Sequence, residues 1–447
     1  MPATLTRRQV LDLRVHVQQL DRASGDLADT AVLDLGVQDT GPDGGRWALA
    51  LRGVDVAADD DLATVWTIRG APHLYRRADL PGVAAATAPF SDADAGKRIF
   101  DAAKPLKAAG ISNLEGLDVV AATMRSVVTA PMVKGEMSGR LTELLPEPYL
   151  RFCRPCDATH VHEMPFRLAA LRAGLELEPG TSPPVLRPVP GLAPVDTVPE
   201  RLDVVADAMR SIVTGPMVKG EMSTRLTAVL DQPYLRFCVP CDATHTYEQP
   251  FRLSALRAGL ELQPGTSPPV LQPIPGFAPA EVVPERLDVV RGYLRLLGPA
   301  TPRLVAGYLD APVKDVQARW PEDAVEVTVD GERRWLLAED AARLDDVPSA
   351  TGVALLGPFD LFLQARDRFL LVDEPARAKA LWPALGRPGA VLAEGDVVGT
   401  WRPRKAGSSL TVTVELWRPV TRAAVTAAAE RLAAFRGIAL KAVQVSD

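Results

Sequence analysis

The feature that most constrains this chain is a segment of 85 residues that occurs twice in tandem. The sequence LDVV begins at positions 117, 202 and 287, so it opens the first copy, the second copy and then a different continuation. Aligned without gaps, residues 117–201 and 202–286 differ at 21 positions and are identical at 64. Units of long-established repeat proteins usually diverge further. The identity indicates a recent duplication of one unit.

Length and composition are those of a globular protein with several domains. The 447 residues leave room for roughly three domains of about 150 residues each. A net charge of −6 argues against a protein that coats nucleic acid indiscriminately, because such proteins are usually basic, but local basic patches remain possible. The chain has no run of about 18 apolar residues and no signal-peptide core, which predicts a cytoplasmic protein without a membrane partner. All four cysteines belong to a duplicated CxxC, so reduced thiols are expected.

Residues 1–116 are predicted to form an N-terminal, winged-helix-like domain. A helix over 5–22 would follow Thr4 or Thr6 as N-cap, and its apolar face is formed by Leu5, Val10, Leu13, Val17 and Leu20. Further helices are expected at 28–36, in WALALRG and at 91–109. Residues 64–80 predict a strand, a turn at 70–72 and a helix from near Arg76.

Each duplicated unit, 117–201 and 202–286, is also predicted to be winged-helix-like. An amphipathic helix over 117–128 precedes two short helices, with Pro131 in a first turn and Ser138 as a cap. The segment PYLRFCRP alternates as a strand does, and a helix should end at Gly174.

The clearest winged-helix pattern lies in residues 287–345. Three helices, the second capped by Thr301, precede a hairpin around Asp330-Gly331. In this arrangement the third helix, about 312–320, lies in a DNA major groove. The polar candidates for DNA contact are Lys314, Gln317 and Arg319 on the helix, with Arg333 and Arg334 on the wing. Acidic neighbours leave a packing module with a solvated charged face as an equal alternative.

Residues 346–447 are predicted to form a C-terminal α/β domain. Strands should meet at turns near Glu394-Gly395 and Ala406-Gly407, and a final helix covers 422–435. Arg402, Arg404 and Lys405 form a basic hairpin tip that suits phosphates, although a solvated turn is the commoner explanation. The fold class predicted for the whole chain is α+β, with tandem winged-helix units followed by an α/β region with a β-hairpin.

The duplicated unit contains a possible metal motif, C-x2-C-x3-H-x2-E. Its residues are Cys153, Cys156, His160 and Glu163 in the first copy, and Cys238, Cys241, His245 and Glu248 in the second. The CxxC spacing suits zinc, but the histidine follows unusually closely and glutamate is an uncommon closing ligand. Two buried thiols at a strand end are therefore the favoured interpretation. No cofactor is predicted.

Four segments resemble the AlkZ-type winged-helix proteins. They are LTRRQVLDLR (5–14), LGVQDTGPDGGRWALALR (35–52), WTIRGAPHLYRRADL (66–80) and GPFDLFLQARDRFLLVDEPARAKALWPALGRPGAVLAEGDVVGTWR (357–402). That family includes bacterial DNA glycosylases that act on alkylated bases and interstrand crosslinks. The resemblance implies tandem winged helices and duplex DNA as the partner.

The resemblance also implies positions for chemistry. Glycosylases of the family position water with a glutamine, an apolar residue and then glutamine or aspartate, where this chain has Gln38, Asp39 and Thr40; only Gln38 matches. Asp39 or Asp43 could supply a carboxylate from a shifted position. The alternative is a turn in which Asp39 or Thr40 caps the next helix.

A histidine beside the cavity is common in the family at the position of His73, which follows Arg69-Gly70-Ala71. His73, with Arg69, is therefore a candidate for contacting a phosphate or a flipped nucleotide, and the alternative is a structural histidine. Three hypotheses follow for the whole protein. The leading one is a DNA-binding protein built from tandem winged helices. The others are an active monofunctional glycosylase that uses Gln38 with Asp39 or Asp43, and a regulator or scaffold without chemistry.

Overall fold

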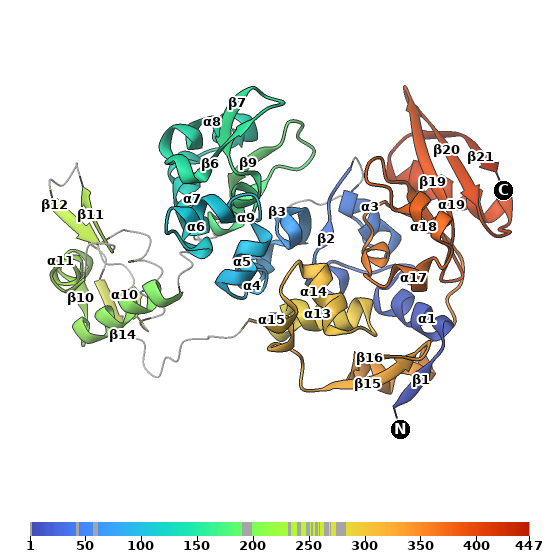
Figure 1. Ribbon diagram of the computed structural model, residues 1–447, viewed down its shortest axis with the longest axis horizontal. Helices are drawn as coiled ribbons and strands as arrows, with labels where there is room; N and C mark the ends of the chain where they lie inside the picture. Colours follow the sequence, from blue (N-terminus) through green and yellow to red (C-terminus); the bar gives the residue numbers. More distant parts are fainter. Residues whose placement is uncertain are drawn as a thin grey trace. The chain divides into compact units, whose positions relative to one another are not determined.

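The computed structural model divides the chain into two compact units, drawn in Figure 1. Unit 1 contains 1–107, 177–182 and 283–447, and unit 2 contains 108–176 and 183–282. The residues described are 2–41, 44–56, 61–189, 199–230, 234–238, 243–246, 251, 254, 258, 260–262, 268, 270–273 and 283–446. Among them, no helix is long and apolar enough to cross a membrane.

The N-terminal part of unit 1 combines short helices with a small antiparallel sheet. Strands β2, β4 and β3 are neighbours in that order. The elements are β1 (Ala3–Leu5), α1 (Arg7–Val17), α2 (Val32–Leu35), β2 (Val37–Gln38), α3 (Gly44–Leu51), β3 (Leu62–Trp66), β4 (Pro72–Arg76), α4 (Leu80–Ala86), α5 (Asp92–Arg98) and α6 (Ala103–Ala108).

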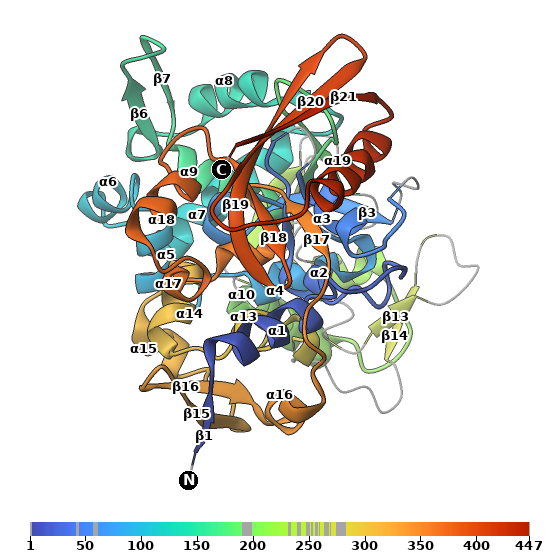
Figure 2. The ribbon, with the colours of Figure 1, turned by 90° about the vertical axis from the view of Figure 1, so that its right-hand side faces the viewer.

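The predicted first helix is confirmed as α1. Thr6 and Gln9 form a reciprocal capping box at its start. Val10 and Leu13 on its apolar face pack in a cluster with residues of β15, β16 and α17. Strand β1 pairs parallel to β15, so the beginning of the chain belongs to the same sheet as residues more than 300 positions later. Figure 2 shows β1, β15 and β16 side by side.

Residues 283–346 form a helical group followed by a hairpin. The elements are α13 (Val289–Leu297), α14 (Pro302–Leu309), α15 (Val313–Gln317), β15 (Ala324–Val329), β16 (Glu332–Leu337) and α16 (Ala338–Ala342). Thr301 caps α14 through the backbone N–H of Leu304, as predicted. The hairpin turns at Asp330-Gly331, where both residues have positive φ, again as predicted.

The C-terminal part of unit 1 is a five-stranded sheet in the order β17-β18-β19-β20-β21. The pairs are antiparallel except β20 and β21, which are parallel and joined through a helix. The elements are β17 (Val353–Leu356), α17 (Arg368–Leu371), α18 (Pro375–Leu381), β18 (Gly389–Ala393), β19 (Asp396–Ala406), β20 (Ser409–Leu416), α19 (Arg422–Phe435) and β21 (Ala439–Ser446). The predicted turns and final helix are confirmed, whereas β21 was not predicted.

In unit 2, the described elements of the second copy repeat those of the first at an offset of 85 residues. The first contains α7 (Asn113–Val127), β5 (Met132–Val133), α8 (Lys134–Leu144), β6 (Leu150–Cys153), β7 (Ala158–Val161), α9 (Glu163–Arg172), β8 (Leu175–Leu177) and β9 (Val185–Pro188). The second contains α10 (Pro199–Ile212), β10 (Met217–Val218), α11 (Lys219–Val229), β11 (Leu235–Cys238), β12 (Ala243–Thr246), β13 (Leu260–Leu262) and β14 (Val270–Pro273). In the first copy two antiparallel strands, β6 and β7, form a hairpin whose turn contains the CxxC motif, and β11 and β12 of the second copy pair in the same register.

The predicted pair of short helices in the repeat is wrong. Met132 and Val133 form strand β5 and pair with β9, so Pro131 precedes a strand and not a helix. One helix, α8, then runs through Ser138. Ser138 is therefore an internal residue of the helix and not its cap. The pairing with β9 comes from residues about 53 positions away and was not visible in the local pattern.

Three other boundaries differ from the sequence prediction. Residues 72–76, which the prediction did not assign to a strand, form β4, and the helix expected from near Arg76 begins as a 3-10 turn at Arg77 and as the α-helix α4 at Leu80. The helix expected over 91–109 is split into α5 and α6. The third helix of the 287–345 region ends at Gln317, and Trp320 then packs edge-on against Trp335. At the coarser level, a mixed α+β fold is confirmed.

Candidate functional site

The candidate site in unit 1 is centred on Gln38, which lies in the short strand β2 opposite His73 of β4. Its side chain is half-buried, and both the nitrogen and the oxygen of its amide are hydrogen-bonded. The amide Nε2 donates to Thr40 Oγ1 at 3.0 Å, and Oε1 accepts from Gln364 Nε2 at 2.7 Å. A glutamine oxygen has a second lone pair and the nitrogen a second N–H, so the fixed amide retains one acceptor and one donor for a water.

Gln364 connects Gln38 to Arg69. The Arg69 Nη2 donates to Gln364 Oε1 at 3.0 Å, while Nη1 donates to the carbonyl of Tyr308 at 2.5 Å. The guanidinium also lies over the Tyr308 ring, 4.8 Å from its centroid. Arg69 has a φ of 57°, a left-handed conformation that is costly for a non-glycine residue. The surrounding contacts therefore hold the turn between β3 and β4 in a defined shape.

Asp39 faces a different set of groups from Gln38. Its Oδ1 accepts the backbone N–H of Gly45 at the start of α3, at 2.9 Å. Its Oδ2 lies 3.3 Å from the Thr64 hydroxyl, which donates to it. This is the helix-capping arrangement that the sequence offered as the alternative to catalysis. Asp43, the other candidate carboxylate, lies outside the described residues.

His73 is buried in the sheet, with 1% of its surface exposed. Nδ1 lies 2.9 Å from the Ala71 carbonyl and 3.1 Å from Thr67 Oγ1, an arrangement that places the proton on Nδ1. Burial, together with the nearby charge of Arg69, lowers the pKa of His73 to about 3. The imidazole is therefore neutral near pH 7.

Four arginines surround this region, and we call them the arginine quartet: Arg69, Arg366, Arg368 and Arg387. Burial lowers the pKa of Arg69, and the charge of Arg366 lowers it further. The pKa values of Arg368 and Arg387 are lowered in the same way, by burial first and by neighbouring arginines second. Within the described residues no member forms a salt bridge. The Nε of Arg366 is buried and has no hydrogen-bond partner among the described residues. The quartet is thus a concentration of positive charge without an ion pair among the described residues.

The carboxylates that could neutralise the quartet are bound elsewhere. Asp367, between two of its members in sequence, is buried and receives hydrogen bonds from Arg14 at 3.1 and 2.7 Å, and also from Arg334. Asp360 is buried with Arg52, at 2.9 and 3.1 Å. Because both carboxylates are already paired with other arginines, the charge of the quartet remains available to a ligand.

Besides Arg69, two further members of the quartet are held by aromatic rings. Arg387 lies over Phe359 at 4.9 Å from the ring centroid, and the carbonyl of Phe359 accepts from Gln364. Arg368 lies over Trp382 at the same distance. Stacking of this kind orients a guanidinium and leaves its edge N–H groups directed outward.

The remaining DNA-contact candidates differ in accessibility. Lys314 and Gln317 are exposed on α15, and Arg319 lies just beyond it, 4.4 Å from the centroid of the Phe90 ring. Arg333 is exposed but paired with Glu326. Arg334 is buried against Asp367 and supports the fold.

The basic hairpin tip is formed as expected. Arg402, Arg404 and Lys405 are exposed on β19, near the turn to β20. No ion pair joins any of the three to another residue in the part of the chain that the structure describes. Figure 2 shows the long β19–β20 hairpin extending beyond the rest of its sheet.

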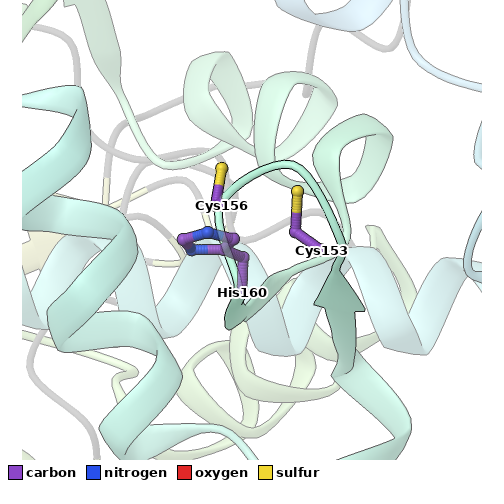
Figure 3. Close-up of side chains that lie close together, drawn as sticks. All are labelled: Cys153, Cys156 and His160. Atoms are coloured by element: carbon purple, nitrogen blue, oxygen red, sulfur yellow. The ribbon is translucent and has the colours of Figure 1, made fainter.

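The metal candidates of the first copy lie together at the tip of the β6–β7 hairpin, as Figure 3 shows for Cys153, Cys156 and His160. Glu163 binds Lys134 and Arg167 instead, each at 2.7 Å. In the second copy, His245 is described within β12, whereas Cys241 and the side chain of Cys238 lie outside the described residues.

Sequence reasoning missed Gln364 and three of the four arginines. They all lie in the segment 357–402, which had drawn attention only as a resemblance. Their proximity to Gln38 depends on contacts across more than 300 residues of chain. The one available signal was the run QARDR at 364–368, in which three polar or basic residues alternate with Ala365 and Asp367.

Comparison with known proteins gives the same fold class and then a family. The structure matches the DNA glycosylase AlkZ of Streptomyces sahachiroi with a TM-score of 0.61 over 99% of this chain and 100% of that one, at 18% sequence identity. The fold is therefore that of a known α+β protein. A family model described as DNA glycosylase AlkZ-like matches residues 32–201 and again 196–435, so the chain belongs to the AlkZ-like DNA glycosylase family. Two successive matches agree with a duplicated middle unit.

A curated relative is named an interstrand DNA cross-link repair glycosylase, also from Streptomyces sahachiroi. It is 30% identical over 132 residues, which cover 28% of this chain and 34% of the relative. The aligned segment thus spans about a third of that relative's length.

Proposed function

We propose that this chain binds duplex DNA and releases damaged bases, with Gln38 holding the attacking water. The observation that best supports this is the fixed amide of Gln38, set between Thr40 and Gln364 and adjacent to the arginine quartet. Membership of the AlkZ-like family and the name of the curated relative, an interstrand DNA cross-link repair glycosylase, point in the same direction.

The substrate class follows from the absence of a strong base beside Gln38 among the described residues. An amide orients a water but cannot take its proton near neutral pH. Excision is then feasible only where the base leaves readily, as an alkylated purine with a positive charge does, because it departs as a neutral molecule. We therefore propose cationic N7-alkylated purines and crosslinks of the same chemistry as substrates.

DNA binding is proposed to use the 287–345 region as a winged helix. Its order of three helices and a hairpin fits that module, with α15 in the major groove and β15–β16 as the wing. Lys314 and Gln317 would face the bases, and Arg402, Arg404 and Lys405 would contact phosphates. The arginine quartet would hold the backbone beside the extruded nucleotide, since stacked guanidiniums with open edges suit phosphate oxygens.

Base release tests the catalytic part. A duplex that contains N7-alkylguanine should lose the base with the parent protein and not with Gln38→Ala. Gln444→Ala, at an exposed glutamine of β21, is the matched control and should retain the activity. Asp39→Asn should also retain it, because the amide oxygen can still cap α3. Loss of activity in Asp39→Asn with normal stability would assign the carboxylate a chemical role instead.

Salt dependence tests the binding part. Arg387→Gln and Arg368→Gln should each weaken binding to an undamaged duplex and reduce the magnitude of the salt slope by about one for each phosphate that the variant no longer binds. Arg377→Gln is the control, because Arg377 is paired with Glu374 on α18. Unchanged slopes in both quartet variants would contradict the phosphate contacts without affecting the base-release result.

A DNA-binding protein without chemistry is the second candidate. The capping role of Asp39 favours it, since that carboxylate is occupied by α3 and by Thr64. DNA binding without base release from any N7-alkylated duplex would support this second function and exclude the first.

A further inference from the structure

The β6–β7 hairpin of the duplicated unit brings together three metal-ligating side chains that take no part in the proposed function. Cys153 ends β6, Cys156 lies in the turn, and His160 lies in β7 opposite Arg151. The turn is closed by a hydrogen bond from the Cys156 N–H to the Cys153 carbonyl, and Asp157 takes a left-handed conformation. From this geometry we propose that Cys153, Cys156 and His160 bind a zinc ion.

The distances suit zinc. The two sulfur atoms and one ring nitrogen all lie within 4.8 Å of one another. Around a tetrahedral zinc with Zn–S bonds of about 2.3 Å, neighbouring ligand atoms are separated by about 3.8 Å. The ligands therefore need to approach by at most about 1 Å, which side-chain rotation at a hairpin tip readily provides. Figure 3 shows the three side chains gathered on the same side of the turn.

The environment favours a ligand role over a packing role. The sequence interpretation was a pair of buried thiols, but Cys156 is exposed and Cys153 only half-buried, so the thiols do not fill a core. The Nε2 of His160 is buried and has no hydrogen-bond partner in the described part of the chain. An unpaired buried nitrogen is unfavourable unless something binds it, and a metal ion would do so.

The fourth position of the sequence motif does not take part, because Glu163 is bound to Lys134 and Arg167. Water would therefore complete the tetrahedron.

The second copy retains the same three residue types, as expected of a duplicated unit. It repeats Cys238, Cys241 and His245 at the same spacing, and the Nε2 of His245 is likewise buried without a described partner. His162 is replaced by Tyr247 in that copy, so the shared ligand set is limited to the two cysteines and the first histidine. We expect one zinc ion in each copy.

Metal analysis of the full chain, purified under reducing conditions without a metal-affinity tag, tests the proposal. The parent should contain about two zinc ions, Cys156→Ser about one, and Cys156→Ser combined with Cys241→Ser close to none. Arg154→Val is the matched control, because the second copy already has Val239 at that position, and it should keep about two.

Cobalt substitution provides a measurement that does not depend on whether the variants fold. Parent protein loaded with Co²⁺ should show thiolate-to-metal charge-transfer absorption, which a chelator removes. A parent that contains no more zinc than the double variant and shows no such absorption with cobalt would overturn the proposal. Formation of a Cys153–Cys156 disulfide in the reduced preparation would overturn it as well.

Discussion

Gln38 and Asp39 are adjacent residues with different surroundings. The amide of Gln38 is fixed by Thr40 and Gln364, while the carboxylate of Asp39 caps α3. The capping alternative for Asp39 was available from sequence because a short polar residue in a turn before a helix has that use locally. The bond from Gln364 was not available, since it joins residues 326 positions apart and no local pattern specifies such a contact.

His73 gives unit 1 a defined sensitivity to acid. Its pKa is about 3 when folded, against an ordinary value near 6.5 when unfolded, so below pH 6.5 only the unfolded chain takes up the proton. The free energy of unfolding is therefore not reduced by His73 above about pH 6.5, and it falls as the pH drops from there towards 3. Between pH 7 and pH 5 the loss due to His73 should be about 2 kcal/mol.

Denaturant unfolding of the parent and of His73→Asn at both pH values measures this contribution. All seven tryptophans lie in unit 1, so their fluorescence reports that unit alone. The variant should lose about 2 kcal/mol less than the parent on going to pH 5. His16→Asn, at an exposed histidine of α1, should behave as the parent does. Equal losses in the parent and His73→Asn would show that His73 is not buried as described.

At the scale of elements, the prediction succeeded where one segment contains the whole signal. Thr301 before Pro302, Asp330-Gly331 between strands, and the helix over 422–435 were all identified correctly. The prediction failed for β5, whose partner β9 is distant in the sequence, and for β4, whose pairing with the preceding strand β3 was not recognised. Strand β21 was missed because its alternation of buried and exposed residues is weak and depends on its parallel partner β20.

The two copies of the repeat bury the same positions. The core of the second copy contains Val205, Met209, Met222, Leu226 and Leu271, among others, and the residues 85 positions earlier are buried in the first. All members of this cluster lie within 205–271, so the second copy has a core of its own. None of the 21 differences between the copies falls on a residue of this cluster, although buried Val161 and Ala169 are replaced by Thr246 and Ser254.

Met209→Ala should unfold the second copy selectively. Met209 is fully buried in α10, and removing such a side chain typically costs about 2–5 kcal/mol. Hydrogen exchange should accelerate in peptides from 199–230, while the tryptophan fluorescence transition of unit 1 stays in place. Val204→Ala, at an exposed position of the same helix, should change neither. A matching shift of the tryptophan transition in Met209→Ala would mean that the copy and unit 1 unfold together.

For the whole molecule, the site candidates and the repeat belong to different parts. Gln38, Gln364 and the arginine quartet all lie in unit 1, which is assembled from both ends of the chain. The overall family resemblance could be predicted from short segments, because those segments form unit 1. The grouping of residues 1–107 with 283–447 could not, since it depends on the pairing of β1 with β15 and on the buried contact between Arg14 and Asp367.

Deletion of residues 202–286 should leave a folded protein. It joins Arg201 to Leu287 and restores the sequence ERLDVV, which spans the start and the end of the second copy. Because the second copy has its own core, its removal should leave the tryptophan unfolding transition and DNA binding close to those of the parent. Aggregation of the shortened chain, or a tryptophan transition at clearly lower denaturant, would show instead that the second copy is an integral part of the protein.

The pairing of β1 with β15 also sets an order of events during synthesis. Leu5 finds its partner Val329 only after the ribosome has made more than 300 further residues, including both copies of the repeat. At about 5–20 residues per second, that interval lasts tens of seconds. The repeats can fold as they emerge, while α1 must wait with its apolar face uncovered. Each added copy lengthens the wait, so the duplication prolongs the time for which this apolar face is uncovered in the nascent chain.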